Sequence, residues 1–284
     1  MNVGVIKLGG SLLEDTGRRH AALMKIVARW NAGESIVLVH GGGKHIDAAL
    51  AAAGIPKKTH AGLRITDDAT LQIVVSVLGG NVNKMLVSEL TKLGVRAAGI
   101  SGCDGGTLIA QHHPPIDGVS LGHVGRVTGS NRMLVRMMLT CGVLPVVSSL
   151  AMNEHGLLLN VNADSAASAI AVAHGAKELL FLTDVAGLLD ADGHVVPTLD
   201  VKGVEKMIAG GIAAGGMRPK LEAAISALTS GVKSIVIGNE RNAAVLGGWT
   251  SGVSPRAGGG EDAASSAGET PAFLHEGGTT LVAA

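Results

Sequence analysis

The chain has 284 residues, a formal net charge of +0 at pH 7 and an aromatic content of 1%, with no Tyr. This length can bury a sizeable core as one large domain or two lobes. A neutral chain has no general attraction to nucleic acid or anionic lipid, and the scarcity of aromatic rings removes the stacking platforms of single-strand binders. We therefore expect no nucleic-acid partner and no membrane partner.

The first residues do not resemble a signal peptide, because Lys7 interrupts their apolar run. No uninterrupted apolar stretch is long enough to span a bilayer either. We expect a soluble, cytoplasmic protein in which Cys103 and Cys141, which lack metal-ligand spacing, are free thiols.

The predicted elements alternate between strands and helices from the first residues onward. Residues 3–8 and 36–40 are short, β-branched and almost wholly apolar, which is typical of strands covered on both faces of a parallel sheet. Between them, 18–31 carries apolar residues at the spacing of one helix face. Further along, the patterns predict helices at 67–78, 82–93, 131–139 and 163–174, and strands at 95–100, 144–147, 178–182 and 234–237.

This alternation predicts an α/β protein whose largely parallel central sheet lies between helices. The pattern breaks into short runs with Gly and Pro over 103–127, where we expect hairpins or an irregular flap. Residues 247–278 are rich in Gly, Ser, Ala and Pro and have little apolar periodicity, so we expect a flexible loop. Residues 279–282 fit a short edge strand.

Glycine turns follow the first two predicted strands, at 9–11 and at 41–43. Glycines let backbone N–H groups approach an anion closely, and a following helix N-terminus favours negative charge; glycines also end strands for purely steric reasons. Neither turn has the three spaced glycines of a dinucleotide site, and the chain contains no GxxxxGK[ST] motif. These departures weigh against a Rossmann dehydrogenase and a P-loop kinase.

Four charged residues stand in apolar or small surroundings. Lys7 interrupts a buried strand directly before a glycine turn, so it either extends from a sheet edge or meets an anion, and we favour the anion. Lys220 follows a glycine pair near a helix start and by itself would be an ordinary surface lysine. Asp164 would be a simple helix cap or an organiser of lysines, and Asp184 lies where a strand ends, at the edge that binds ligands in α/β proteins.

Ten segments in one order resemble the amino acid kinase family: IKLGGSLL, VLVHGGGKHID, HAGLRITDDATL, GGNVNKMLVSEL, GISGCDGG, LGHVGRV, LNVNADSAASAIA, FLTDVAGLL, GGMRPKLEAA and GGTTL. The resemblance implies a three-layer αβα sandwich. It also implies an acceptor-binding and dimerisation lobe at 1–175 and an ATP-binding lobe at 176–284. The implied reaction is the ATP- and Mg²⁺-dependent phosphorylation of the side-chain carboxylate of N-acetyl-L-glutamate, the second step of arginine biosynthesis.

The resemblance also implies roles for individual residues. Lys7 and Lys220 would stabilise the transferring phosphoryl group, with Asp164 orienting them. The acceptor would be held by Gly42, Gly43, Arg64, Asn160 and Asn162. The nucleotide would be held by Gly9, Gly10, Thr183, Asp184, Val185, Gly187, Leu188, Leu189, Ile212, Gly215 and Met217. The protein itself would supply no metal ligand, because Mg²⁺ would be bound mainly through the phosphates of ATP.

The chemistry agrees with these roles, because an acceptor carboxylate is already ionised and needs no general base. The reaction needs two repelling anions held in line, which suits lysines, Mg²⁺ and backbone N–H groups. Four alternatives stay open at this point. The acceptor could be N-acetylaminoadipate, N-succinylglutamate or a carrier-bound aminoadipate or glutamate, or the chain could be a non-catalytic sensor. Because the first strand begins at Val3, we expect a homodimer that lacks the N-terminal helix of arginine-inhibited relatives.

Overall fold

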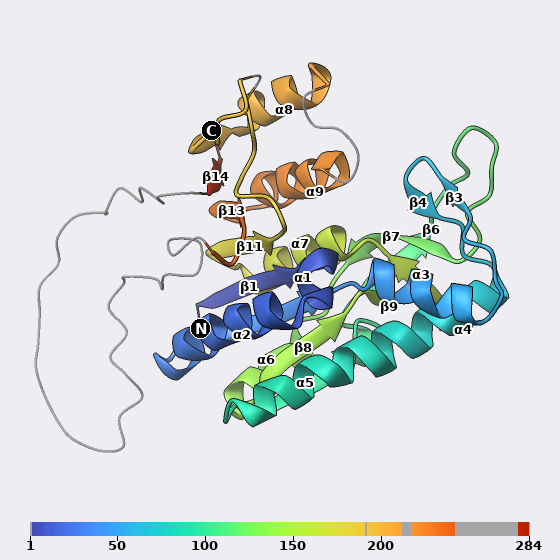
Figure 1. Cartoon of the computed structure of the whole chain (residues 1–284), viewed down its shortest axis with the longest axis horizontal. Helices are drawn as coiled ribbons and strands as arrows, with labels where there is room; N and C mark the ends of the chain where they lie inside the picture. Colours follow the sequence, from blue (N-terminus) through green and yellow to red (C-terminus); the bar gives the residue numbers. More distant parts are fainter. Residues whose placement is uncertain (1, 191, 212–216, 242–277, 284) are drawn as a thin grey trace, which may run out of the picture.

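The structure is a computed structural model that describes residues 2–190, 192–211, 217–241 and 278–283. Its centre is an eight-stranded sheet in the order β12, β14, β13, β11, β1, β2, β8, β5 (Figure 1). In chain order these strands are β1 (Val3–Leu8), β2 (Ser35–His40), β5 (Ala97–Ser101), β8 (Leu144–Ser148), β11 (Glu178–Leu182), β12 (Thr198–Asp200), β13 (Ser234–Gly238) and β14 (Thr279–Val282). From β13 to β5 every neighbouring pair is parallel, whereas β14 runs antiparallel to β13.

Helices cover both faces of this sheet, which gives the three layers that the sequence predicts. They are α1 (Gly10–Glu14), α2 (Thr16–Asn31), α3 (Gly43–Ala52), α4 (Asp68–Val75), α5 (Asn83–Lys92), α6 (Met133–Thr140), α7 (Ala163–His174), α8 (Val201–Ala209) and α9 (Met217–Thr229). In Figure 1, α2 and α5 lie in front of the strands. On the other layer α7 packs against both β1 and α9.

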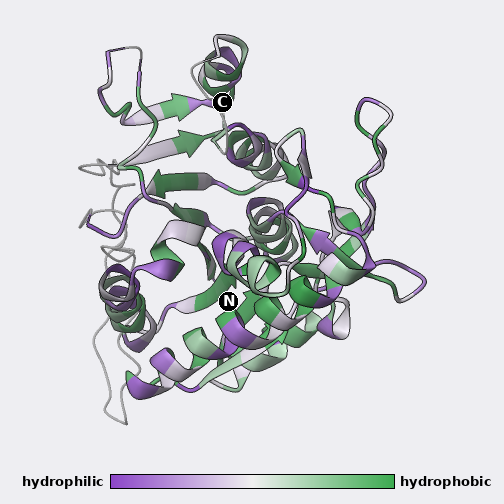
Figure 2. Cartoon of the chain, turned by 45° about the vertical axis from the view of Figure 1, so that its right-hand side comes forward, coloured by the Kyte–Doolittle hydropathy of each residue, from purple (hydrophilic) through white to green (hydrophobic). Residues whose placement is uncertain are grey.

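The core follows from the apolar strands. Every residue of β1 is buried, as is every residue of β11 after Glu178. Figure 2 shows the hydrophobic colour concentrated on the central strands, with hydrophilic residues on the outer faces of helices and in loops. A buried parallel strand tolerates a charge such as Lys7 only where that charge is paired.

Two smaller strand groups lie beyond the carboxyl end of the sheet. Strands β6 (Ile109–His112), β7 (Val124–Gly129), β9 (Leu150–Met152) and β10 (Leu158–Val161) close into a four-stranded barrel. A two-stranded hairpin joins β3 (Thr59–His60) to β4 (Leu63–Arg64). The hairpin β6–β7 and the 3₁₀ turn Asp104–Gly106 confirm the irregular flap that was expected over 103–127.

The helical patterns at 67–78 and 82–93 belong to one continuous run, because the π-helix Ser76–Val82 joins α4 to α5. By length and composition alone, this run of Asp68–Lys92 could cross a membrane. Its α5 part packs against β5, β8 and α2, as a core helix does.

The prediction of an edge strand at 279–282 is wrong in one respect. Strand β14 lies inside the sheet, because β12 pairs with its outer side and takes the edge position. The expected loop at 247–278 lies, up to residue 277, outside the described residues. Both cysteines are free thiols, as expected.

Candidate active site

The most buried charges in this region form a triad from three elements. Lys7 of β1, Asp164 in the first turn of α7 and Lys220 in the first turn of α9 each have a side chain that is no more than 10% exposed. The Nζ atom of Lys7 lies 2.8 Å from Oδ1 of Asp164. The Nζ atom of Lys220 donates to Oδ1 and Oδ2 of the same carboxylate, at 3.0 and 3.2 Å. The triad carries one positive charge in excess, so it can receive an anion.

Burial and charge act in opposite directions within this triad. Burial would raise the pKa of the Asp164 carboxyl, but the charges of Lys7 and Lys220 outweigh it and hold that pKa below its ordinary value. Burial, together with the like charge of Lys7, lowers the pKa of Lys220 to about 8 despite the attraction of Asp164. The Nζ atom of Lys220 also lies 5.1 Å from the ring centroid of Phe181, which places it over an aromatic face.

The two glycine turns lie next to the triad, at the carboxyl ends of β1 and β2. A Cβ on Gly9 would approach the carbonyl oxygen of Leu182 to 2.7 Å, and the N–H of Gly9 donates to that same oxygen at 2.8 Å. The N–H of Gly9 is therefore engaged within the fold, contrary to the expectation that it would face a phosphate. The helix α1 that begins at Gly10 has no side-chain cap.

Helix α3 also begins without a side-chain cap, directly after Gly42. A Cβ on Gly42 would meet Leu78 of the π-helix at 2.9 Å, so this turn needs glycine for the close approach of that helix. Because the first-turn N–H groups of α3 lack a capping side chain, they are available to an anion at the helix N-terminus. Gly43 lies at this position and is exposed.

A buried polar pair, His40 and Asn83, contacts the glycine turn at 41–43 from inside the protein. His40 is fully buried; its Nδ1 donates to the carbonyl oxygen of Gly41 at 2.9 Å, and its Nε2 accepts from Nδ2 of Asn83 at 3.1 Å. The same Nδ2 lies 3.0 Å from the carbonyl oxygen of Val146. Burial lowers the pKa of His40 to about 4, so the ring is neutral at physiological pH and acts as a fixed strut rather than a base.

Arg64 is held beside the second turn with part of its guanidinium unused. Its Nη2 donates to Oδ1 of Asp47 on α3 and to the carbonyl oxygen of Gly43, at 2.5 and 3.1 Å. Its Nη1 is buried and has no hydrogen-bond partner among the described residues. Lys57 holds the other oxygen of Asp47 at 2.8 Å. An arginine that is fixed through one nitrogen and unpaired at the other is suited to a carboxylate.

The two asparagines predicted to bind the acceptor have different positions. Asn160 of β10 donates through Nδ2 to Oγ1 of Thr66 at 3.2 Å, and that hydroxyl donates to the carbonyl oxygen of Arg64 at 2.9 Å. Asn162 caps α7, because its Oδ1 accepts from the N–H groups of Asp164 and Ser165. Asp164 is therefore not the cap, and the amide nitrogen of Asn162 is left for another partner.

The segment predicted to hold the nucleotide follows β11. Thr183 Oγ1 donates to Asp184 Oδ1 at 3.0 Å, and Asp184 is exposed and interacts with Ser11 of the first turn. Burial raises the pKa of the Asp184 carboxyl, but hydrogen bonds from Thr183 and from its own backbone hold it below the ordinary value. Val185 is half-buried and Met217, at the start of α9, is also half-buried.

The end of the predicted nucleotide segment, residues 187–189, contacts β14. Leu188 is buried and its N–H donates to Oγ1 of Thr279 at 2.7 Å, while Leu189 is exposed. Gly187 has no room for a side chain, because a Cβ would meet Thr279 Oγ1 at 2.7 Å. Ile212 and Gly215, predicted to contact the nucleotide, lie outside the described residues.

Sequence reasoning missed residues that hold the predicted ones in place. Asp47 lies four residues after Gly43, which is one turn of a helix. This spacing is the only sequence signal that Asp47 could lie near the glycine turn at 41–43. A bidentate pair joins Arg18 of α2 to Glu240 beyond β13, with N–O distances of 2.6 and 2.8 Å. Nothing local in the sequence links Arg18 to Glu240.

In the described part of the chain, one group of side chains has the spacing to bind a metal ion, namely Asp190, Asp192 and His194. All three lie on one exposed turn, and Oδ1 of Asp190 already accepts from the N–H groups of the other two residues. This group is separate from the triad and carries no argument about catalysis.

Glycine turns, uncapped helix starts and two lysines on one carboxylate, gathered at one sheet edge, define a site of the phosphoryl-transfer class. The model that describes the amino acid kinase family matches residues 2–239. The chain belongs to the amino acid kinase family.

Relatives with curated names agree with this membership. Acetylglutamate kinase from Solibacter usitatus (strain Ellin6076) is 42% identical over 233 residues, which are 82% of this chain and 89% of the relative. Acetylglutamate kinase from Rubrobacter xylanophilus is 40% identical over 252 residues, 89% of this chain and 95% of the relative.

Solved structures share the fold. The crystal structure of smu.665 from Streptococcus mutans UA159 superposes with a TM-score of 0.75 at 30% identity, over 84% of this chain and 94% of the other. N-acetylglutamate synthase from Neisseria gonorrhoeae superposes with a TM-score of 0.78 at 22% identity, over 99% of this chain and 59% of the other. The second likeness concerns the fold alone.

Proposed function

We propose that this chain is an acetylglutamate kinase, which transfers the γ-phosphoryl group of ATP to the side-chain carboxylate of N-acetyl-L-glutamate. The products are ADP and an acyl phosphate, and the reaction belongs to arginine biosynthesis. The proposal is supported by curated relatives of that name at about 40% identity over most of both chains. The single structural observation that carries it is the triad of Lys7, Asp164 and Lys220, with its excess positive charge beside two glycine turns.

Each part of the site then has a task. Lys7 and Lys220 neutralise the charge that develops on the transferring phosphoryl oxygens, and Asp164 keeps the two ammonium groups close despite their mutual repulsion. The free Nη1 of Arg64 receives the α-carboxylate of the acceptor, helped by the N–H groups after Gly42 and by Asn160. The acceptor carboxylate attacks directly, because it is already ionised.

The nucleotide is assigned to the edge formed by Gly10, the segment 183–189 and the start of α9. Both oxygens of Asp164 are engaged by lysines, and we propose that Mg²⁺ binds mainly through phosphate oxygens of ATP. When bound there, Mg²⁺ would neutralise part of the phosphate charge. We further propose an acceptor lobe at 1–175, a nucleotide lobe at 176–284, a homodimer and a cytoplasmic location.

Hydroxylamine tests this function directly, because it converts an acyl phosphate into a coloured hydroxamate. We expect hydroxamate only when ATP, Mg²⁺ and N-acetyl-L-glutamate are present together. N-acetyl-L-glutamine, which has an amide in place of the side-chain carboxylate, is the matched control and should give none. Formation of hydroxamate from ATP without any acceptor would contradict the proposal. Failure to form hydroxamate with every acceptor tested would also contradict it.

A further inference from the structure

A large groove opens beside the proposed acceptor site. Its volume is about 1150 Å³, and it lies between β7, α7 and α9. Pockets of roughly 300–1,000 Å³ bind drug-sized molecules, and N-acetyl-L-glutamate, an amino acid with a two-carbon acyl group, is much smaller than those. The groove therefore offers more room than the proposed acceptor fills.

The mouth of the groove coincides with neighbours of the acceptor residues. Leu63, which precedes Arg64 in β4, lines it, and so does Val124, the register partner of Asn160. Asn162 lines the groove directly. Of the residues assigned to the acceptor, Asn162 is the one that the groove shares, so the groove continues from the acceptor site rather than replacing it.

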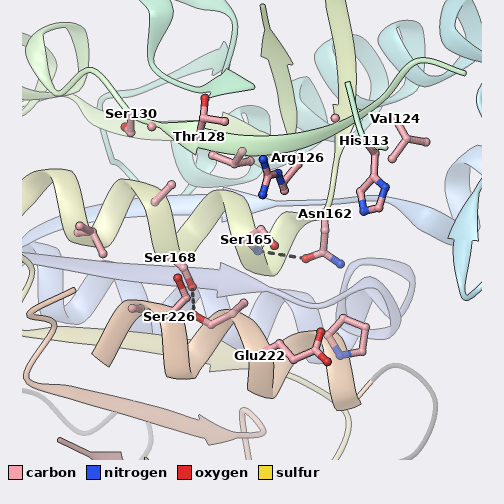
Figure 3. Close-up of a pocket in the computed structure, with 18 of the residues that line it drawn as sticks. His113, Val124, Arg126, Thr128, Ser130, Asn162, Ser165, Ser168, Glu222 and Ser226 are labelled. Atoms are coloured by element: carbon pink, nitrogen blue, oxygen red, sulfur yellow. Dashed lines mark hydrogen bonds between the residues drawn. The ribbon is translucent and has the colours of Figure 1, made fainter. Parts of the chain in front are cut away.

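Beyond the mouth, the walls contain both polar and apolar residues, and most of their side chains are small. Helices α7 and α9 present small residues to the groove, and its opposite wall is β7. Figure 3 shows Arg126 of β7 on the opposite side of the groove from α7. Val124 and Arg126 are two residues apart on one strand, which separates them by about 7 Å along the groove.

The charges of the groove are unbalanced. Its charged lining residues are Arg126, Arg218 and Glu222, and Arg218 Nε is paired with Glu222 Oε1 at 2.9 Å. Arg126 is exposed, and its guanidinium has no ion pair or hydrogen bond to any residue that the structure describes. A free planar guanidinium in a groove is suited to a carboxylate, which it can bind through two parallel hydrogen bonds.

We propose that Arg126 is a specificity-determining residue that binds a carboxylate at the far end of the acyl group of a longer acceptor, such as an N-succinyl amino acid. This inference rests on the proposed function, because it places the amino-acid part of the acceptor at Arg64. The acyl carboxylate takes no part in the reaction. The γ-phosphoryl group still passes from ATP to the side-chain carboxylate, with ADP as the leaving group.

Three acceptors separate length from charge: N-acetyl-, N-butyryl- and N-succinyl-L-glutamate. The butyryl and succinyl groups have four carbons each, and the succinyl group alone ends in a carboxylate. We expect the wild-type enzyme to use the succinyl acceptor with a kcat/KM at least tenfold above that for the butyryl acceptor. A hydrogen bond to a charged group has about this effect.

The variant Arg126→Gln removes the charge and keeps a polar side chain of similar size. We expect it to lower the ratio of kcat/KM for the succinyl acceptor over that for the acetyl acceptor at least tenfold. Arg218→Gln is the matched control in the same groove, because Arg218 is already paired with Glu222, and it should change that ratio less than twofold.

The outcomes are distinguishable. A succinyl acceptor no better than the butyryl acceptor, or an unchanged ratio in Arg126→Gln, overturns the inference and leaves the proposed function standing. If Arg218→Gln lowered the ratio of kcat/KM values as much as Arg126→Gln does, the inference would also be overturned. The effect would then come from the total charge of the groove and not from Arg126. Absence of turnover with all three acceptors overturns the proposed function itself.

Discussion

The two charged clusters at this edge of the sheet are built in opposite ways. The triad of Lys7, Asp164 and Lys220 is buried, and among the residues that the structure describes its members form ion pairs only with one another. Arg64 comes from a short hairpin, is held by the partly exposed Asp47, and keeps one buried nitrogen without a partner among the described residues. The triad thus offers excess charge and the remaining N–H groups of two ammonium ions, whereas Arg64 offers one vacant hydrogen bond of fixed direction.

This difference separates stability from binding. Removing Asp164 would leave two buried lysines without a counter-charge, whereas removing either lysine would leave a balanced pair. A partly exposed pair contributes little to stability, so its residues can be changed with the fold intact. Variants of Asp164 should therefore affect folding and turnover together, variants of the two lysines should affect mainly turnover, and variants around Arg64 should affect acceptor binding alone.

The largest effect is expected for Asp164→Ala. This variant leaves two buried lysines without their counter-charge, so the free energy of unfolding should fall by about 3–5 kcal/mol. Turnover should fall at least a hundredfold. Denaturant titration measures the first quantity and steady-state kinetics the second. Glu14→Ala, which breaks an exposed pair with Lys44, is the control and should lower the free energy of unfolding far less. Equal stability losses in both variants would contradict the role of the triad.

The lysines should separate the two effects. Lys7→Ala and Lys220→Ala each remove one donor to the phosphoryl group, so turnover should fall at least a hundredfold, by about 2–4 kcal/mol at the transition state. Lys220→Ala should destabilise the fold less than Asp164→Ala, because burial already disfavours the Lys220 charge. Circular dichroism checks that each variant is folded. Near wild-type turnover in either folded variant would refute the assignment.

Activity should also decrease at alkaline pH. In the free enzyme the pKa of Lys220 is lowered to about 8, so this lysine is charged below that pH and neutral above it. Losing the charge weakens attraction to ATP, so kcat/KM for ATP should fall by about tenfold per unit above pH 8. Bound phosphates favour the ammonium form, so the kcat profile should turn down at a higher pH. A kcat/KM profile that stays flat to pH 10 would contradict this.

Much of the fold follows from the sequence because its central strands are long apolar runs. The predicted strands at 3–8 and 178–182 and the helix at 163–174 coincide with β1, β11 and α7. Strand β12 went unrecognised, since its three residues have no alternation to detect. The inner position of β14 depends on pairing with β12, which is a tertiary contact that no local pattern contains.

The site was harder to derive from the residues alone. Lys7 was expected to meet an anion, and its partner in the structure is the Asp164 carboxylate. Without the family resemblance, Lys220 would be taken for a surface lysine, but it is 6% exposed, because it lies on the inner side of α9 against Phe181. Its partner is 56 residues away in the chain, so no spacing rule links them.

Asp47 gives the smallest and most selective expected effect. The change Asp47→Asn keeps the shape of the side chain but removes the charge that fixes Arg64, so Arg64 should sample more than one orientation. We expect KM for N-acetyl-L-glutamate to rise about threefold to tenfold, because a charge-assisted hydrogen bond becomes a weaker neutral one, with kcat and KM for ATP unchanged. Arg64→Ala should raise the same KM further, because it removes the nitrogen that binds the acceptor carboxylate.

Lys57→Met tests whether Asp47 acts through Arg64. Lys57 pairs with the other oxygen of Asp47 and its side chain is 52% exposed, so its loss should change acceptor KM less than Asp47→Asn does. If Asp47→Asn raised KM in an Arg64→Ala background as much as in the wild type, the two effects would be independent. Asp47 would then not position Arg64, and the directional binding that distinguishes this cluster from the triad would have another origin.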